Sequence, residues 1–158
     1  ENWAIAAIYS YLDGGVAVPG ATPFVTDAIG SGGSTQAFGI SGFWQPLQGG
    51  WIPSISAGYG INRSSGSDLR TSQSWLLGLQ WSDVLVQGNN AGMGLGQPAF
   101  ATATRNGAAT ESGAWAFECW YEWTVSDAIS VTPALFVLTD GGDGADQIGA
   151  LIKTSFRF

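Results

Sequence analysis

The strongest indication of the fold is the C-terminal segment Asp146-Gln-Ile-Gly-Ala-Leu-Ile-Lys-Thr-Ser-Phe-Arg-Phe158. Even-numbered positions from 148 to 158 hold Ile, Ala, Ile, Thr, Phe and Phe, and odd-numbered positions from 147 to 157 hold Gln, Gly, Leu, Lys, Ser and Arg. Because successive side chains of a strand point to opposite faces, this alternation predicts a β-strand with one apolar and one polar, basic face. A strand of a soluble β-sandwich would show the same alternation.

The composition of the whole chain is apolar and poor in charge. Of 158 residues, 45% are hydrophobic and only 11% are charged, whereas an ordinary soluble domain has about 25% charged residues. No apolar run approaches the roughly 18–20 residues that a transmembrane helix requires. This combination is typical of a lipid-exposed β-barrel, because each strand places only half of its residues against lipid.

Charge and cysteine content narrow the possibilities further. The net charge of −7 disfavours nucleic acid as a partner. Cys119 is the single cysteine, so no intramolecular disulfide can form. The sequence starts with neither an initiator Met nor a signal peptide, and we expect it to be a processed protein or a fragment.

Seven further segments show the same alternation as the C-terminal stretch. They are Asn2–Leu12, Gln36–Trp44, Trp51–Asn62, Thr71–Ser82, Val84–Gln97, Ser112–Val125 and Ala128–Thr139. Together these give about eight strands, each long enough to cross a bilayer at a tilt. We therefore predict an all-β fold, an antiparallel up-and-down transmembrane β-barrel in which residues 1–158 form a single domain.

The connections between these strands alternate in predicted length. The short ones are Gln45–Gly50, Asp83 and Ser126–Asp127, and the mostly longer ones are Asp13–Thr35, Arg63–Arg70, Pro98–Glu111 and Asp140–Ala145. Outer-membrane barrels have short periplasmic turns and long external loops. An even number of strands also places both chain ends on the periplasmic side.

Aromatic residues gather at the periplasmic strand ends of this predicted barrel. They are Trp44, Trp51, Trp81, Trp123 and Phe158. Amphipathic rings favour the headgroup region of a bilayer, so these residues are predicted to form a membrane girdle. The alternative is that they are core aromatics of a soluble β-protein.

Two connections allow more than one interpretation. The segment Asp13–Thr35 is too apolar for a solvated loop and would fold into the lumen, cover a neighbouring subunit or form an external hairpin. The segment 140–146 is rich in Asp and Gly but lacks the spacing and the terminal Glu of a calcium-binding loop. A Gly/Asp turn is therefore favoured over a metal site there.

Several segments resemble the OprB-like porins of cyanobacteria, which are known as carbohydrate-selective or iron-uptake porins. They are Leu79–Val86, Asn89–Pro98, Trp120–Val125, Ile129–Leu138 and Gly149–Phe158. An aromatic residue that ends the closing strand is also common in outer-membrane barrels. The resemblance implies an outer-membrane location, a trimer, and a barrel of about sixteen strands of which this chain is the C-terminal half.

Small residues at the inward positions also favour a barrel wider than eight strands. They are Ser54, Ser56, Gly58, Gly60, Ser74, Gly78, Ala114, Ala116, Ala134 and Gly149. The interior of an eight-stranded barrel is normally just filled by its own side chains. We therefore expect further strands, from the same protein or from a second chain, and water inside.

Catalytic chemistry is not indicated, and neither a cofactor nor a metal is expected. The sequence contains no His, which excludes Ser–His triads and HExxH zinc sites. Glu118 and Glu122 are the only inward acidic pair, and four residues along a strand separate them by roughly 13–14 Å. Glycosidase carboxylates lie no more than about 9.5 Å apart, so the pair is not a sugar-cleaving dyad.

The inward charges make better sense as a pore wall formed by Glu118, Trp120, Glu122, Lys153 and Arg157. Counting through the turns places Glu118, Ala134 and Lys153 in one transverse row of side chains. The same counting places Glu122, Ser130 and Arg157 in another. Each row would form a salt bridge or set a local field across the lumen, or its charges would only solubilise the wall. Trp120 would stack on a sugar or pack under a loop.

The sequence thus predicts an outer-membrane porin for passive diffusion of small hydrophilic solutes, which the resemblance narrows to inorganic ions or sugars. The expected partners are outer-membrane lipid and either identical subunits or the remaining strands of the barrel. Two alternatives stay open: a non-conducting structural barrel of the envelope, and a soluble β-sandwich that serves as a binding module.

Overall fold

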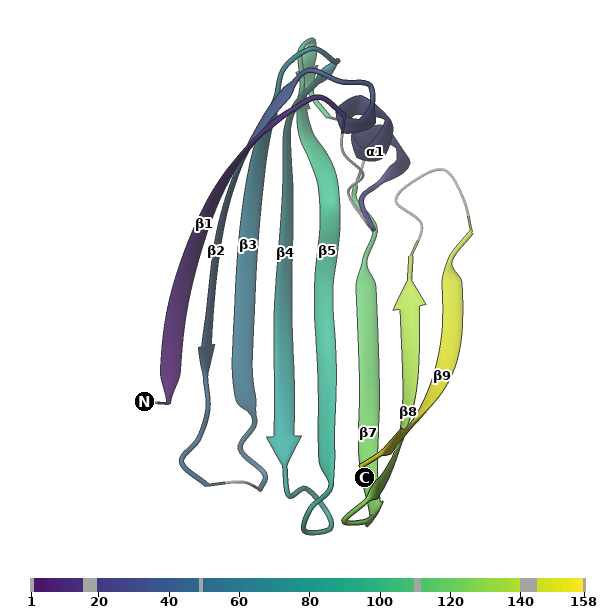
Figure 1. The fold of residues 1–158 in the computed structure, drawn as a ribbon. Coiled ribbons are helices and arrows are strands. Elements are labelled where there is room, and N and C mark those ends of the chain that lie inside the picture. The colour runs from purple at the N-terminus through teal and green to yellow at the C-terminus, as the bar shows by residue number, and fades with distance from the viewer. Residues whose placement is uncertain (1, 16–19, 49, 110–111, 140–144, 158) are drawn as a thin grey trace.

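The computed structural model describes residues 2–15, 20–48, 50–109, 112–139 and 145–157. These residues form one antiparallel nine-stranded sheet and a short helix (Figure 1). The elements in chain order are β1 (Trp3–Asp13), α1 (Pro23–Gly30), β2 (Ser34–Trp44), β3 (Ser54–Ser64), β4 (Leu69–Ser82), β5 (Asn90–Thr104), β6 (Gly107–Ala108), β7 (Ala116–Ser126), β8 (Ile129–Leu138) and β9 (Gln147–Phe156).

The predicted all-β fold and its eight long strands are confirmed. The strands lie side by side in the order β1-β2-β3-β4-β5-β7-β8-β9, and β6 only extends the β5 hairpin. Each strand pairs with the next long strand of the chain, which is the up-and-down order. Both chain termini lie at one end of the sheet and α1 lies at the other (Figure 1), so we call these the termini end and the helix end.

The sheet is open. β1 and β9 stand at the two edges of the strand order, and the described residues do not pair these edges with each other. The structure therefore shows the antiparallel sheet that the sequence predicts but not a closed cylinder.

The register confirms the predicted division of side chains between two faces. Ile55 lies beside Trp44 and Leu79, whereas Ser56 lies beside Phe43 and Gly78. We call the face of Ile55 the apolar face and the face of Ser56 the small-residue face. Outside the register irregularities of β4–β5 and β7–β8, each pairing joins residues of the same predicted face, so the alternation seen in single strands extends across the sheet.

The predicted boundary between the fourth and fifth strands is wrong. Residues 83–89 form a turn instead of the single-residue connection expected at Asp83, and β5 begins at Asn90. The Asp83 carboxylate accepts a hydrogen bond from the Gly88 backbone N–H at 2.8 Å, and Val84 and Asn89 close the turn through a 3.1 Å backbone bond. Leu85 has a φ of 65° there, a conformation that an apolar strand pattern does not reveal.

The predicted alternation of connection lengths holds only in part. At the helix end, β3 and β4 are joined by residues 65–68 alone, whereas residues 45–53 join β2 and β3 at the termini end. The connections 14–33 and 127–128 do follow the prediction. Most of the Asp- and Gly-rich segment 140–146 lies outside the described residues, so the prediction of a turn there is not tested.

The helix α1 was not predicted, and it forms the small buried core of the molecule. Val25 and Ile29 of α1 are 0% and 3% exposed and pack against Leu69 and Ala101. Ser72, which is 0% exposed and aligned with Ala101, belongs to the small-residue face. The helix therefore covers the small-residue face at the helix end, which is the face that the sequence predicts to be inward.

Tertiary contacts stabilise α1 more than local signals do. Its N-cap residue, Thr22, makes no side-chain capping bond, but the Thr22 backbone N–H donates to the Ala99 carbonyl at 3.0 Å. Pro23 occupies the start of the helix, where the missing N–H has no cost. No helix in the described part of the chain has the length and apolar character needed to cross a membrane.

Candidate functional site: the two faces of the sheet

The apolar face has two transverse rows that cross all eight long strands. One contains Trp3, Trp44, Ile55, Leu79, Met93, Cys119, Leu135 and Ala150, and the next contains Ile5, Gly42, Ala57, Leu77, Leu95, Phe117, Val137 and Ile148. Neither row holds a charged side chain. The side chains of Ile5 and Ile148 are 68% and 78% exposed, so the described part of the chain leaves this apolar surface uncovered.

An aromatic belt crosses the apolar face at the termini end. Trp3 pairs with Trp44, and the predicted girdle residues Trp81 and Trp123 lie on the same face. Trp51 lies outside β3, contrary to prediction, but its carbonyl accepts a 3.1 Å hydrogen bond from the Trp81 indole N–H. Phe158 lies outside the described residues. We refer to these aromatics as the termini-end belt.

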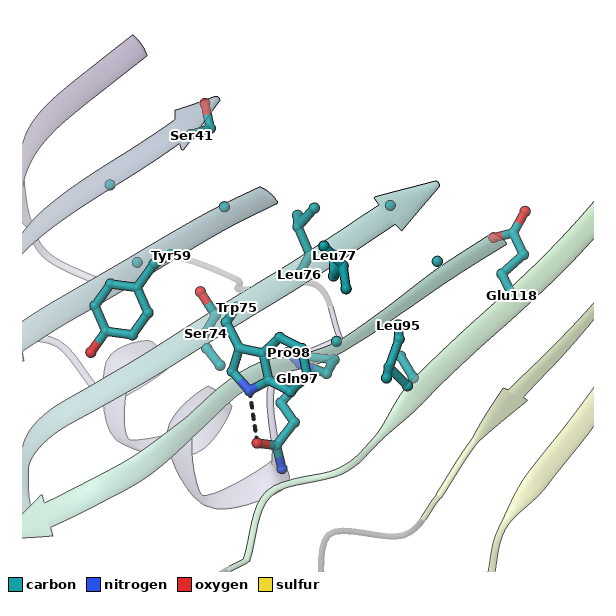
Figure 2. Close-up of a pocket in the computed structure, with 18 of the residues that line it drawn as sticks. Ser41, Tyr59, Ser74, Trp75, Leu76, Leu77, Leu95, Gln97, Pro98 and Glu118 are labelled. Carbon is teal, nitrogen blue, oxygen red and sulfur yellow. Dashed lines mark hydrogen bonds between the residues drawn. The ribbon is translucent and has the colours of Figure 1, made fainter. Parts of the chain in front are cut away.

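A second belt of aromatic residues crosses the apolar face at the helix end, and it was not predicted from the sequence. Trp75 donates from its indole N–H to the Gln97 side chain at 2.9 Å, a bond drawn in Figure 2. The Tyr59 hydroxyl donates to the Gln73 side chain at 3.0 Å. Trp75 also packs edge-to-face on Trp115, with ring centroids 5.5 Å apart. We call this group, with Tyr9, the helix-end belt.

On the small-residue face, several large side chains pack against glycines of neighbouring strands. Four large side chains lie against a glycine on a neighbouring strand: Ile8 on Gly39, Leu76 on Gly58, Trp120 on Gly92 and Phe136 on Gly149. A Cβ atom added to any of these glycines would lie within 3.4 Å of the large side chain. The glycines therefore let bulky residues lie flat on the wall instead of projecting from it.

Two concavities lie along this face of the sheet. The larger has a volume of about 1030 Å³ and runs across the middle of the sheet, between Ala6 on β1 and Leu138 on β8. Figure 2 shows Leu76 and Glu118 directed to one side of the sheet at this site, and Trp75, Gln97 and Leu95 directed to the other. The smaller concavity, of about 420 Å³, lies between Phe43 and Trp120.

Both charge rows expected from the sequence are wrong in their members. Glu118 is aligned with Gly94 and Phe136, not with Ala134. Lys153 is aligned with Thr132, whereas Arg157 follows the end of β9. β7 continues to Ser126, so the turn at 127–128 lies one residue later than predicted, and an irregularity between Thr124 and Ser126 changes the β7–β8 register once more.

The two glutamates have different surroundings. The Glu122 carboxylate accepts a 3.1 Å hydrogen bond from the Asn90 side chain and another from the Ser130 hydroxyl, and Lys153 and Arg157 attract it electrostatically. Glu118 is exposed, and no residue in the described part of the chain forms a hydrogen bond or an ion pair with it. Glu122 thus has polar neighbours on two strands, whereas Glu118 lines both concavities without a hydrogen bond or an ion pair to the described residues.

Trp120 stands between the two glutamates on the same face. It is half-buried, because its indole ring lies over Gly92 of β5, and it lines the smaller concavity together with Glu118. Of the five residues predicted to line a pore, three lie on β7, Lys153 lies on β9 and Arg157 directly follows β9. The structure brings Glu122, Lys153 and Arg157 together and leaves Glu118 with Trp120.

One comparison with known proteins gives a match. The chain is 32% identical over 130 residues to an uncharacterised protein of Synechocystis sp. (strain ATCC 27184 / PCC 6803 / Kazusa), an alignment that covers 78% of this chain. The chain spans only about a quarter, 24%, of the length of that protein. No protein-family model matches the sequence, and no solved structure matches it either.

Proposed function

We propose that this chain forms part of the wall of an outer-membrane β-barrel through which small hydrophilic solutes, inorganic ions and sugars, diffuse passively. The observation that carries the proposal is the apolar face with its two aromatic belts. A surface of this kind is unfavourable in water, because exposed apolar area costs roughly 25 cal/mol per Å².

The spacing of the belts supports contact with lipid. Trp75 and Trp81 are six residues apart along β4, and Trp3 and Tyr9 are six residues apart along β1. At about 3.4 Å per residue each separation is roughly 20 Å along the strand. The apolar band of outer-membrane barrels is about 25 Å tall, with aromatic girdles at both interfaces.

The open edges support a larger barrel. In a bilayer, each unpaired backbone N–H and C=O costs several kcal/mol, so β1 and β9 need neighbouring strands. The Synechocystis protein, about four times as long as the aligned part, has enough sequence to provide further strands. A barrel of about sixteen strands, alone or in a trimer, would give the small-residue face a water-filled lumen.

A non-conducting structural barrel is the second candidate, and one observation favours it. α1 covers the small-residue face at the helix end, and Ile8 and Leu76 expose apolar side chains on that face. In a narrower barrel these groups would block the passage of hydrophilic solutes.

Conductance separates the two candidates. The intact protein that contains this chain is purified in detergent and added to a planar lipid bilayer between salt solutions. A porin gives discrete, stepwise increases in current, and a structural barrel gives none. Extraction of the protein into aqueous buffer without detergent would contradict both candidates and favour a soluble binding module.

A further inference from the structure

We propose that Glu118 and Trp120 form a binding site for a small organic cation, an ammonium group that carries an apolar body. The proposal rests on the proposed function in one respect: the small-residue face must line a space that solutes enter. It adds to that function a class of solute and the residues that retain it.

The carboxylate of Glu118 supplies the charge. Its cross-strand neighbours are Gly94, which has no side chain, and Phe136, which cannot donate a hydrogen bond. Lys153 is aligned with Thr132, four residues along β8 from the Phe136 that faces Glu118, so it does not share the row of Glu118. Glu118 is also the only charged residue among those that line either concavity in the described part of the chain. A ligand held there therefore gains most from a positive charge.

The indole of Trp120 supplies a surface for the cation. Trp120 lies two residues from Glu118 on the same face of β7. Its ring lies over Gly92 and so stays low on the wall, beside the smaller concavity. Trp is the strongest of the aromatic residues for binding a cation over its ring face. Together the two residues offer an ion pair and a cation–π contact to one ligand.

The concavity itself selects the size and the apolar part of the ligand. Its volume of about 420 Å³ lies within the range of small-molecule sites. Phe43 closes one side, and Ser56 and Gln80 add polar groups. An inorganic cation would leave Phe43 and Trp120 unused, whereas a neutral sugar beside Glu118 would leave the carboxylate without a counter-charge. An organic cation satisfies both halves of the site.

Benzyltrimethylammonium is the probe for this site. Its binding to the intact protein in a non-ionic detergent is measured by ligand-observed NMR titration, with benzyl alcohol and glucose as neutral comparisons. We expect Glu118→Gln and Trp120→Leu each to weaken binding about three- to fivefold, in line with exposed ion-pair and cation–π contacts. Glu122→Gln, on the same strand and face, is the matched control and should leave the affinity within about twofold.

Two results would overturn the proposal. One is equal binding of benzyl alcohol, glucose and the cation; the other is an unchanged affinity in Glu118→Gln. Circular dichroism verifies the folding of each variant, and if Trp120→Leu does not fold, the exposed Glu118 decides the question alone. Because binding is measured in detergent, cation binding without conductance steps would refute the porin, and conductance without cation binding would refute this site.

Discussion

The two faces of the sheet differ in what their side chains do with a neighbouring strand. On the apolar face, large residues such as Leu79 and Met93 stand beside each other and project outward. On the small-residue face, large residues such as Trp120 lie down on a glycine. The first face presents a continuous exposed apolar surface, and the second forms the two concavities. The contrast shows that one sheet can carry two different surfaces, depending on which residues meet across its strands.

A charge placed on the apolar face should give the largest effect. We expect Ile55→Arg and Leu79→Arg to destabilise the protein in lipid by about 2–4 kcal/mol, because an arginine at the bilayer midplane is costly. Ser56→Arg and Gln80→Arg, on adjacent positions of the same strands, should cost much less because their face is wet. Folding yields after transfer from detergent to lipid vesicles measure the difference. Equal yields for both pairs would show that the faces are reversed or that the apolar face does not meet lipid.

Glycine substitution tests whether the large side chains of the small-residue face pack against glycines. In Gly92→Ala the new Cβ atom would meet the Trp120 indole, and we expect a loss of about 1–3 kcal/mol from overpacking. Gly94→Ala is the matched control, since no atom lies within 4 Å of its added Cβ. Alanine at that position should be neutral or slightly stabilising. Thermal unfolding followed by circular dichroism compares the two variants, and similar melting temperatures would refute this packing.

The helix-end belt predicts a smaller effect. Trp75→Phe leaves the side-chain oxygen of Gln97, a residue that is 9% exposed, without its indole donor. We expect a loss of about 1–2 kcal/mol, the usual cost of a broken buried hydrogen bond. Trp123→Phe, at an exposed position on the same face, is the comparison and should cost less. Chemical denaturation of both variants in detergent measures the difference, and equal losses would mean that the Gln97 bond contributes nothing.

Ion selectivity should give the smallest effect and depends on the proposed pore. Lys153→Gln combined with Arg157→Gln should raise the cation-to-anion permeability ratio by about two- to threefold at low salt, because it removes two positive charges and leaves Glu122 unopposed. Glu118→Gln should lower that ratio more than Glu122→Gln, because Glu118 has no neighbouring base. Reversal potentials under a salt gradient measure the ratio. Unchanged ratios in all variants would place these residues away from the conducting path.

The binding and conductance experiments bear on different parts of the comparison between the two faces. Binding of benzyltrimethylammonium at Glu118 would make the small-residue face a selective surface as well as an open one. Absence of conductance would leave the apolar face intact as a lipid-facing surface and remove the need for a wide lumen.

The local alternation of the sequence was sufficient for the strands and for their faces. Ile55, Ala57, Tyr59 and Ile61 alternate with small or polar residues, and the period of two determines the side of each residue once the segment is a strand. The prediction of eight long antiparallel strands and the choice of Trp44, Trp81 and Trp123 as face aromatics required no more than this. Whether these faces meet lipid and water is a property of the surroundings and remains a prediction.

Only the tertiary structure decided which residues meet across strands. The turn at 127–128 and the irregularity near Thr124 and Ser126 together place Glu118 beside Phe136 instead of Ala134, because a shift of one pair changes every later partner. The β8–β9 register then places Gly149, and not Lys153, beside Phe136. α1 escaped prediction because Val25 and Ile29 need Leu69 and Ala101, far away in sequence, to bury them. Alternation along a strand is a local property that sequence encodes directly, whereas register and burial depend on partners that only the folded chain brings together.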